Sequence, residues 1–185
     1  MLHDILFAIW FFLPAAEANV WPIPTAKLPL LRNWNAPMDF GKTWRGKRIL
    51  GNHKTWRGLI IGIIAATLFL WLEQAIVRRH VWAQNLTAGY DYAHYPTLIL
   101  GPLFAIGALG GDALKSFFKR QRGVKSGDTW MFFDQLDYIV GGALLVTPYI
   151  VLSLSQYFWL LMFWFVMHLV FSYIGFKMHL KDAPI

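Results

Sequence analysis

Two clusters of charged side chains have the types and spacing needed for chemistry on a phosphate group. If the segment around residue 112 is helical, four side chains at i, i+3, i+4 and i+7 share one face. They are Asp112, Lys115, Ser116 and Lys119. A second helix face begins with Asp134 and Asp137, which are spaced i, i+3. Because a short loop joins these two helix ends, we expect three carboxylates and several cations to converge.

Such a cluster suits phosphoryl-type transfer. Carboxylates together with phosphate oxygens are the usual ligands of Mg²⁺, and a cation is needed between Asp134 and Asp137 if they point the same way. The reaction needs cations over the phosphate oxygens and in-line placement, but no Ser or Cys nucleophile, because a phosphate monoester is itself nucleophilic. The alternative is that these charges only anchor helix ends by snorkelling or mutual pairing. Asp112 fits that alternative least, because a short carboxylate cannot reach far toward water.

The segment before residue 58 contains a second set of candidate phosphate ligands. Lys42-Thr43-Trp44-Arg45-Gly46 is echoed twelve residues later by Lys54-Thr55-Trp56-Arg57-Gly58. Either these are basic, Trp-anchored contacts with lipid headgroups, or they are donor-rich turns that bind phosphates. Residues 36–43 fit a relaxed Walker A pattern, but the buried strand and the helix that a P-loop requires are not indicated. Gly41 and Lys42 still suit phosphate binding, because glycine lets backbone N–H groups approach an anion.

Membrane spans must position these residues. The chain is 57% hydrophobic and only 15% charged, and a helix needs about 20 mostly apolar residues to cross a hydrocarbon core of roughly 30 Å. The first span is the least regular, because it contains Pro14 and Glu17 and resembles a signal-peptidase site, although no Lys or Arg precedes it. We expect an all-α polytopic membrane protein with about five transmembrane helices in a single domain, 1–185. The expected spans are about 3–21, 58–77, 95–118, 135–154 and 156–177.

The basic residues predict the orientation. Of the 17 Lys and Arg residues, all except Arg78 and Arg79 fall in segments on one predicted side. The positive-inside rule then places the N-terminus outside and the C-terminus in the cytoplasm of a multi-pass cell-membrane protein. Loops of about 22–57 and 119–134 are cytoplasmic, with the active site at that face. In so apolar a chain, the net charge of +7 indicates lipid headgroups, a phosphorylated substrate or topology signals rather than nucleic acid.

The segment from Gly111 to Asp137 resembles the signature of the CDP-diacylglycerol synthases. The matching positions, in order, are Gly111, Asp112, Ser116, Lys119, Arg120, Lys125, Asp134 and Asp137. The sequence departs from the signature at Ser126 and Gln135, where that family has Asp and Arg, and in a shorter spacing before the final pair.

The archaeal CDP-archaeol synthase family resembles more of the chain, from Leu13 to about Gly142. Its pattern L-P-A-x-x-A-N-x-x-P corresponds to Leu13–Pro22, its P-x-D-F-G-K-T to Pro37–Thr43, and its K-T-W-R-G to Lys54–Gly58. The resemblance implies a Mg²⁺-dependent cytidylyltransferase. Such an enzyme transfers CMP from CTP to an unsaturated polyprenyl ether-lipid phosphate within the membrane, giving CDP-archaeol and pyrophosphate.

The resemblance also implies residue roles. The metal ligands would be Asp112, Asp134 and Asp137. The nucleotide and phosphate groups would be bound by Asn19, Lys42, Thr43, Arg48, Lys54, Thr55, Arg57 and Ser116. Developing charge would be neutralised by Lys119, Arg120 and Lys125, and these would act in catalysis with the three aspartates. The lipid chains would leave sideways between helices into the bilayer.

Two alternatives are kept. The same reaction on a diacyl lipid phosphate would make the protein a phosphatidate cytidylyltransferase, and a sequence does not reveal pocket shape. A small non-enzymatic transporter or scaffold would predict charges near mid-bilayer or a repeated half, and the sequence has neither. The CDP-alcohol phosphotransferases also use membrane aspartates and Mg²⁺, but their long D-G-x-x-A-R…G-x-x-x-D-x-x-x-D pattern does not occur here.

Overall fold

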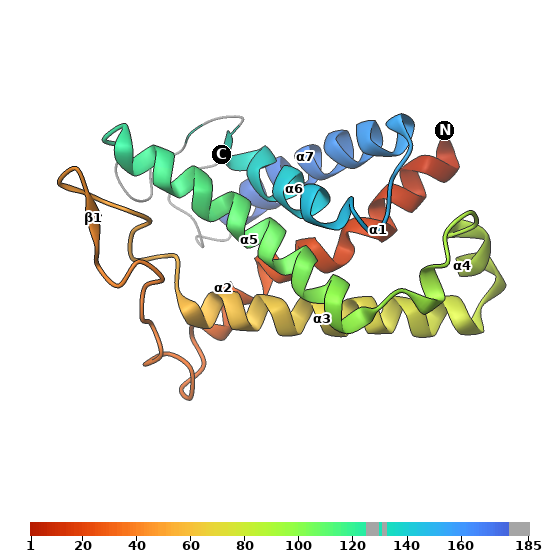
Figure 1. The fold of residues 1–185 in the computed structure, drawn as a ribbon, viewed down its shortest axis with the longest axis horizontal. Helices are drawn as coiled ribbons and strands as arrows, with labels where there is room; N and C mark the ends of the chain where they lie inside the picture. The colour runs from red at the N-terminus through yellow and green to blue at the C-terminus, as the bar shows by residue number, and fades with distance from the viewer. Residues whose placement is uncertain (125–129, 131–132, 178–185) are drawn as a thin grey trace.

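The computed structural model describes residues 1–124, 130 and 133–177, and these form a bundle of long helices with a small hairpin (Figure 1). The helices are α1 (Leu2–Val20), α2 (Pro22–Thr25), α3 (Trp56–Arg79), α4 (Val81–Leu86), the 3₁₀ helix η1 (Tyr92–His94), α5 (Thr97–Gln121), α6 (Phe133–Val146) and α7 (Leu154–Lys177). The hairpin pairs β1 (Thr43–Trp44) with β2 (Lys47–Arg48) in antiparallel register. The expected all-α membrane fold is confirmed.

Four helical segments in the described residues are long and apolar enough to cross a membrane. They are Leu2–Thr25, Trp56–Arg79, Thr97–Gln121 and Leu154–Ile174. The remaining long helix, α6, has 14 residues, or about 21 Å, which is shorter than a hydrocarbon core. It ends at Val146 rather than near the expected residue 154, because Pro148 cannot continue a helix.

The non-helical segment after α6 is partly covered by protein. Ile150 and Leu152 are both buried, with 2% and 5% of their surface exposed. Tyr149 and Val151, beside and between them, are 49% and 71% exposed. A half-length helix followed by this partly buried turn therefore stands where a full fourth span was expected.

The core of the bundle is aromatic and centres on α1, which contacts α3, α5, α6 and α7. Phe7, Phe11 and Phe12 are fully buried on one side of α1. Phe11 meets Phe104 of α5 edge-on, with ring centroids 5.3 Å apart. Phe12 lies 5.5 Å from the ring of Trp164 in α7. Despite its internal proline, the segment expected to be the least regular span is the central element of the fold.

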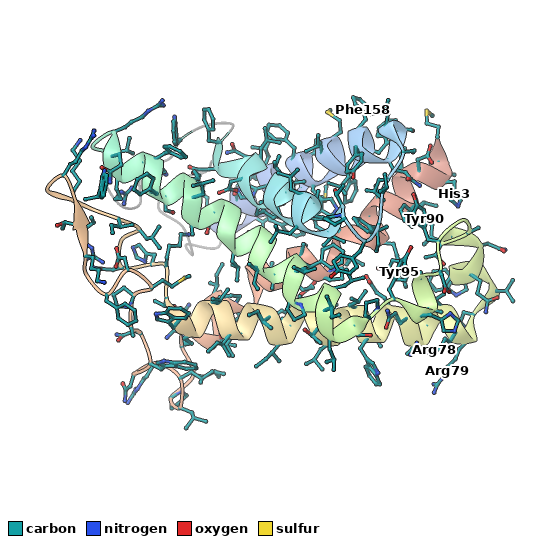
Figure 2. All side chains as sticks on the ribbon, viewed as in Figure 1. His3, Arg78, Arg79, Tyr90, Tyr95 and Phe158 are labelled. Atoms are coloured by element: carbon teal, nitrogen blue, oxygen red, sulfur yellow. The ribbon has the colours of Figure 1, made fainter. Side chains whose placement is uncertain are left out.

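The two ends of the bundle differ in character. The hairpin, the start of α3, the end of α5 and the start of α6 lie at one end, and the N-terminus and α4 lie at the other (Figure 1). Arg78 and Arg79 lie at the same end of the bundle as His3 (Figure 2). We call the end with the hairpin the polar end, defined as residues 26–55, residues 111–121 of α5 and the first two turns of α6. The described residues of both segments expected to be cytoplasmic thus lie at one end.

The start of α3 is fixed by a side-chain cap. The hydroxyl of Thr55 accepts a hydrogen bond from the backbone N–H of Gly58 at 3.1 Å. Such a cap satisfies one of the N–H groups that the first helical turn leaves without a partner. The cap fixes the position of Lys54, the residue just before Thr55, at the polar end of the bundle.

Candidate active site

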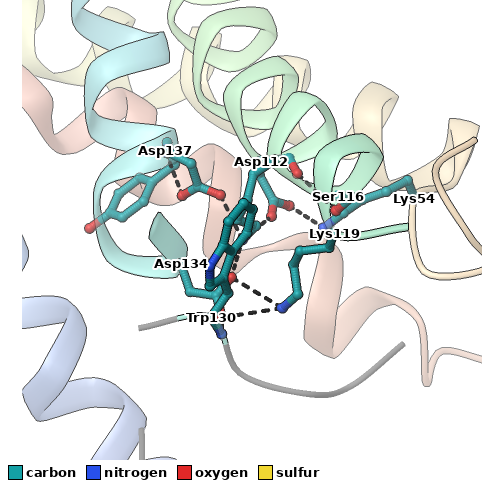
Figure 3. A network of polar contacts seen from close by, with 9 residues as sticks. Lys54, Asp112, Ser116, Lys119, Trp130, Asp134 and Asp137 are labelled. Atoms are coloured by element: carbon teal, nitrogen blue, oxygen red, sulfur yellow. Dashed lines mark hydrogen bonds and ion pairs between the residues drawn. The ribbon is translucent and has the colours of Figure 1, made fainter. Parts of the chain in front are cut away.

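Three carboxylates meet at the polar end, where α5 and α6 approach each other (Figure 3). The Nζ atom of Lys115 lies 2.9 Å from Oδ1 of Asp112 and 2.9 Å from Oδ1 of Asp134. The same atom lies 2.6 Å from Oδ2 of Asp137. The two helix ends therefore bring together all three aspartates that the sequence analysis selected, around one ammonium group.

Two more lysines balance this cluster. Lys54, from the segment before α3, forms an ion pair with Oδ2 of Asp112. Lys119 lies 3.3 Å from each carboxylate oxygen of Asp134. With Lys115, these lysines match three negative charges with three positive ones. Such matching is needed, because a buried charge without a partner costs several kcal/mol.

Backbone donors also orient the carboxylates of α6. The N–H of Trp130 donates to Oδ2 of Asp134 at 2.6 Å, and the N–H of Tyr138 donates to Oδ1 of Asp137 at 2.6 Å. Asp134 lies in the first turn of α6, where the positive end of the helix dipole favours an anion. The carboxylate oxygens that remain point at the cations.

Glycines let α5 and α6 come close enough for this convergence. A Cβ atom on Gly111 would overlap the carbonyl oxygen of Asp137 and lie 3.0 Å from its carbonyl carbon. A Cβ atom on Gly107 would lie 2.8 Å from Cα of Gly142. Small residues permit such direct backbone packing between membrane helices. Gly111 directly precedes Asp112, so this contact sets the separation of Asp112 and Asp137.

A carboxylate organises the hairpin loop as well. Asp39 accepts hydrogen bonds from the backbone N–H groups of Gly41, Leu50 and Gly51 at 2.9–3.1 Å. Nη2 of Arg48 donates to it at 2.8 Å. Burial alone would raise the pKa of Asp39, but these hydrogen bonds hold that pKa well below its usual range.

The Asp39 contacts change the interpretation of the Walker-like segment. In this loop, Phe40 and Gly41 have positive φ angles of 48° and 80°, and the N–H of Gly41 turns back toward the loop's own aspartate. The anion bound by the glycine turn is therefore Asp39. The exposed Lys42 and Thr43 follow in the hairpin, where Thr43 pairs with Arg48 in the strand register.

The hairpin is docked onto the end of α5. Lys47 Nζ donates to the carbonyl of Gln121 at 2.6 Å, and Gln121 Nε2 donates to the carbonyl of Arg48 at 3.4 Å. On its other side, the N–H of Met38 donates to the carbonyl of Lys54 at 2.7 Å. The loop therefore contacts both the end of α5 and the segment that contains Lys54, the partner of Asp112.

A cavity of about 450 Å³ with both polar and apolar walls opens beside the carboxylate cluster. Its lining includes five of the residues selected from the sequence, namely Asn19, Lys54, Thr55, Arg57 and Asp112. Asn35, Asn52 and His53 line it too. Sequence analysis did not select these three, and their only signal was proximity to the basic repeat. Asp112 belongs both to the cavity and to the carboxylate cluster.

Several selected residues have more local contacts. Ser116 donates from its hydroxyl to the carbonyl of Asp112, one turn back in α5, at 2.8 Å. Buried Arg57 donates to the carbonyl of Leu31 at 3.2 Å. Arg120 lies close to the docked loop, since a Cβ on Gly51 would be 3.8 Å from its Nη1. Lys125 lies outside the described residues.

The carboxylate cluster supplies donors of the type that Mg²⁺ needs. In the residues that the structure describes, no three His, Cys, Asp or Glu side chains are arranged to hold a metal ion as they stand. Lys115 Nζ occupies the point on which the three carboxylates converge. These are hard oxygen donors, the type that Mg²⁺ prefers, and they already surround a single cation. The chemistry fits the ion, provided that the ammonium moves away.

Comparison with known proteins points to one family. A family model described as "CarS-like: CDP-archaeol synthase" matches residues 1–185. The chain is 32% identical to the CDP-archaeol synthase of Pyrococcus furiosus, with 99% of each chain covered. It is 34% identical to that of Methanococcus maripaludis over 99% of this chain and 98% of the relative.

A solved structure agrees with the sequence relatives. It is an intramembrane enzyme for archaeal membrane lipid biosynthesis, with 27% sequence identity and a TM-score of 0.67. The match covers 89% of this chain and 92% of that one. The structural similarity therefore extends over most of the chain.

Proposed function

This chain belongs to the CDP-archaeol synthase family, and we propose that its three-aspartate cluster is the catalytic centre of a Mg²⁺-dependent CMP transfer. The protein is a CTP-dependent cytidylyltransferase that acts on a lipid phosphate in a membrane. The proposed acceptor is an unsaturated polyprenyl ether-lipid phosphate. The products are CDP-archaeol and pyrophosphate.

The observation that carries the proposal is the position of Asp112 between two features. One of its oxygens faces Lys115 in the cluster, and the other pairs with Lys54, which lines the 450 Å³ cavity. A triphosphate in that cavity would therefore lie next to the carboxylates. The cavity walls supply cationic Lys54 and Arg57 and amide groups from Asn19 and neighbouring asparagines.

The chemistry follows from this arrangement. A phosphate oxygen of the lipid attacks the α-phosphorus of CTP, so that a new P–O bond forms as the bond to the β-phosphate breaks and pyrophosphate leaves. Mg²⁺, held by Asp112, Asp134 and Asp137, would supply charge neutralisation on the phosphate oxygens. Lys54 and Lys119 bind and orient phosphate groups at the two sides of the cluster. The protein contributes positioning and electrostatics, and it needs no covalent intermediate.

The acceptor approaches from the bilayer in this proposal. An apolar groove of about 240 Å³ lies between α6 and α7 and includes Val140, Leu144 and Leu161. Val140 and Leu144 lie one and two turns beyond Asp137 on α6. A hydrocarbon chain in this groove would place its phosphate at the start of α6, beside the carboxylates.

The orientation is part of the proposal. The polar end faces the cytoplasm, where CTP is made, and the end with Arg78 and Arg79 faces outside. The bias of basic residues supports this orientation, and so does the gathering of both basic segments at one end of the bundle (Figure 1).

The test uses the purified full chain in detergent with labelled CTP and Mg²⁺. Unsaturated ether-lipid phosphate and diacyl phosphatidate are supplied in parallel, and Asp112→Asn serves as the inactive comparison. We expect labelled CDP-lipid from the ether substrate and at least about 100-fold less from Asp112→Asn. Preference for the ester would instead identify a phosphatidate cytidylyltransferase. Absence of CDP-lipid from both substrates would overturn the proposal.

A further inference from the structure

Lys115 occupies an unusual position for a lysine in an active site that uses a metal. Its ammonium contacts all three aspartates, and its side chain is only 13% exposed. Lys54 and Lys119 each contact one aspartate of the three. In the described residues, Lys115 is the side chain that joins α5 to both carboxylates of α6.

This position is one that a divalent ion would need. The nitrogen–oxygen distances are 2.6–2.9 Å, whereas Mg²⁺ binds oxygen at about 2.0–2.1 Å. An ammonium and a metal ion cannot occupy the same point. Without any cation there, three carboxylates packed this closely would repel one another, because like charges in a poorly solvated site interact strongly.

We propose that Lys115 is an internal counter-cation, which holds the three aspartates together when no metal is bound and is displaced when the metal arrives with the nucleotide. The inference rests on the proposed metal role of the three aspartates. Lysine suits this exchange because its ammonium is carried on a flexible four-carbon stem and makes undirected contacts. The side chain leaves its position by rotation, without movement of α5.

A second consequence is coupling between metal and nucleotide. A metal ion that binds without nucleotide must displace the Lys115 ammonium from its three ion pairs. The displaced ammonium then has no equivalent partners. When the triphosphate is present, its oxygens lie beside Asp112, and the displaced Lys115 pairs with them. Each ligand thus makes the other bind more tightly, and by thermodynamic linkage the effect is reciprocal. Metal binding without nucleotide is therefore weak in the unmodified protein.

Binding of Mn²⁺ to the purified full chain in detergent tests this role without turnover, using the electron paramagnetic resonance signal of free Mn²⁺ in the absence of nucleotide. Lys115→Met keeps the stem and removes the competing charge. We expect it to bind Mn²⁺ at least about tenfold more tightly than the unmodified protein, within the usual range of coupling between sites. Lys47→Met is the matched control, because Lys47 lies at the polar end and, among the described residues, its ammonium donates to the carbonyl of Gln121 rather than to an aspartate. It should bind Mn²⁺ as the unmodified protein does.

Thermal unfolding gives a second readout. In chelator, Lys115→Met should unfold at a lower temperature than the unmodified protein. Addition of Mn²⁺ should raise the unfolding temperature of Lys115→Met by more than it raises that of the unmodified protein. If the variant is too unstable in chelator, purification in Mn²⁺ followed by chelator titration measures the same difference.

Equal Mn²⁺ affinity of Lys115→Met and Lys47→Met would overturn the role of Lys115. An unmodified protein that binds Mn²⁺ equally well with and without CTP would also overturn it. Failure of CMP transfer by the unmodified protein is measured separately and would count against the proposed function alone.

Discussion

Substitution of Gly111 by alanine should separate the two halves of the active site. Real Cβ atoms are rarely found within 3.0 Å of another heavy atom, and a Cβ here would overlap the carbonyl oxygen of Asp137 and also lie 3.4 Å from Cα of Gly141. The two backbones must therefore part by close to 1 Å to relieve the overlap, and by more than about 1 Å for ordinary contact. This movement separates Asp112 on α5 from Asp137 on α6.

The expected cost falls mainly on catalysis. A misplacement of about 1 Å in a catalytic constellation lowers the rate by about 100-fold, and overpacking a tight contact costs about 1–3 kcal/mol of stability. We therefore expect Gly111→Ala to fold with a modestly lower unfolding temperature and to transfer CMP 10- to 100-fold more slowly. Steady-state turnover with saturating CTP and lipid phosphate in detergent is the assay.

The neighbouring glycine is a matched control. A Cβ atom on Gly110 would have no heavy atom within 4 Å, and alanine favours a helix over glycine by up to about 1 kcal/mol. Gly110→Ala should therefore retain turnover within about threefold of the unmodified protein. Equal turnover by Gly110→Ala and Gly111→Ala, with both monodisperse, would refute the account of the α5–α6 contact.

Three further predictions follow from the loop, the cavity and the topology. Asp39→Asn should raise the KM for CTP by about tenfold and the KM for lipid phosphate much less, because the charged contact with Arg48 that shapes the hairpin is lost. Since the pKa of Asp39 lies below its usual range, its carboxylate is ionised from pH 5 to pH 8, and a steep pH dependence of this effect would contradict the argument. Lys54→Met should lower kcat/KM at least about 30-fold, the effect of about 2 kcal/mol that is typical when one partner of a buried charged pair is removed; a change under threefold would count against Lys54 as a phosphate ligand. Because the chain has no cysteine, single cysteines can report topology in intact cells: an impermeant maleimide should label Asp91→Cys and not Lys42→Cys, and the opposite labelling would reverse the proposed orientation.

Local patterns in the sequence predicted much of the architecture. Apolar runs located the long helices, and the i, i+3 spacing of Asp134 and Asp137 placed both at the start of one helix. Pro148 indicates that α6 is short, because proline cannot continue a helix. The apolar residues beyond it, such as Ile150, Val151 and Leu152, obscured that signal, because they continue the hydrophobic run of the helix.

The details of the site depended on long-range packing. Lys115 was placed on the correct helix face, but its contacts with the carboxylates of α6 depend on how closely α5 and α6 approach at Gly111. Asp39 was noticed only as part of a motif, because its donors come from both sides of the hairpin. His53 acquires its place in the cavity wall only when the loop folds against α1 and α5. None of these relations is visible from residue spacing.

An anomalous diffraction map from crystals grown with CTP and Mn²⁺ would test the central claim most directly. The account predicts a manganese peak at about 2.1 Å from carboxylate oxygens contributed by both α5 and α6, with triphosphate oxygens completing its coordination. Manganese bound elsewhere, with Asp112, Asp134 and Asp137 all outside its coordination shell, would contradict the assignment of this cluster as the catalytic centre.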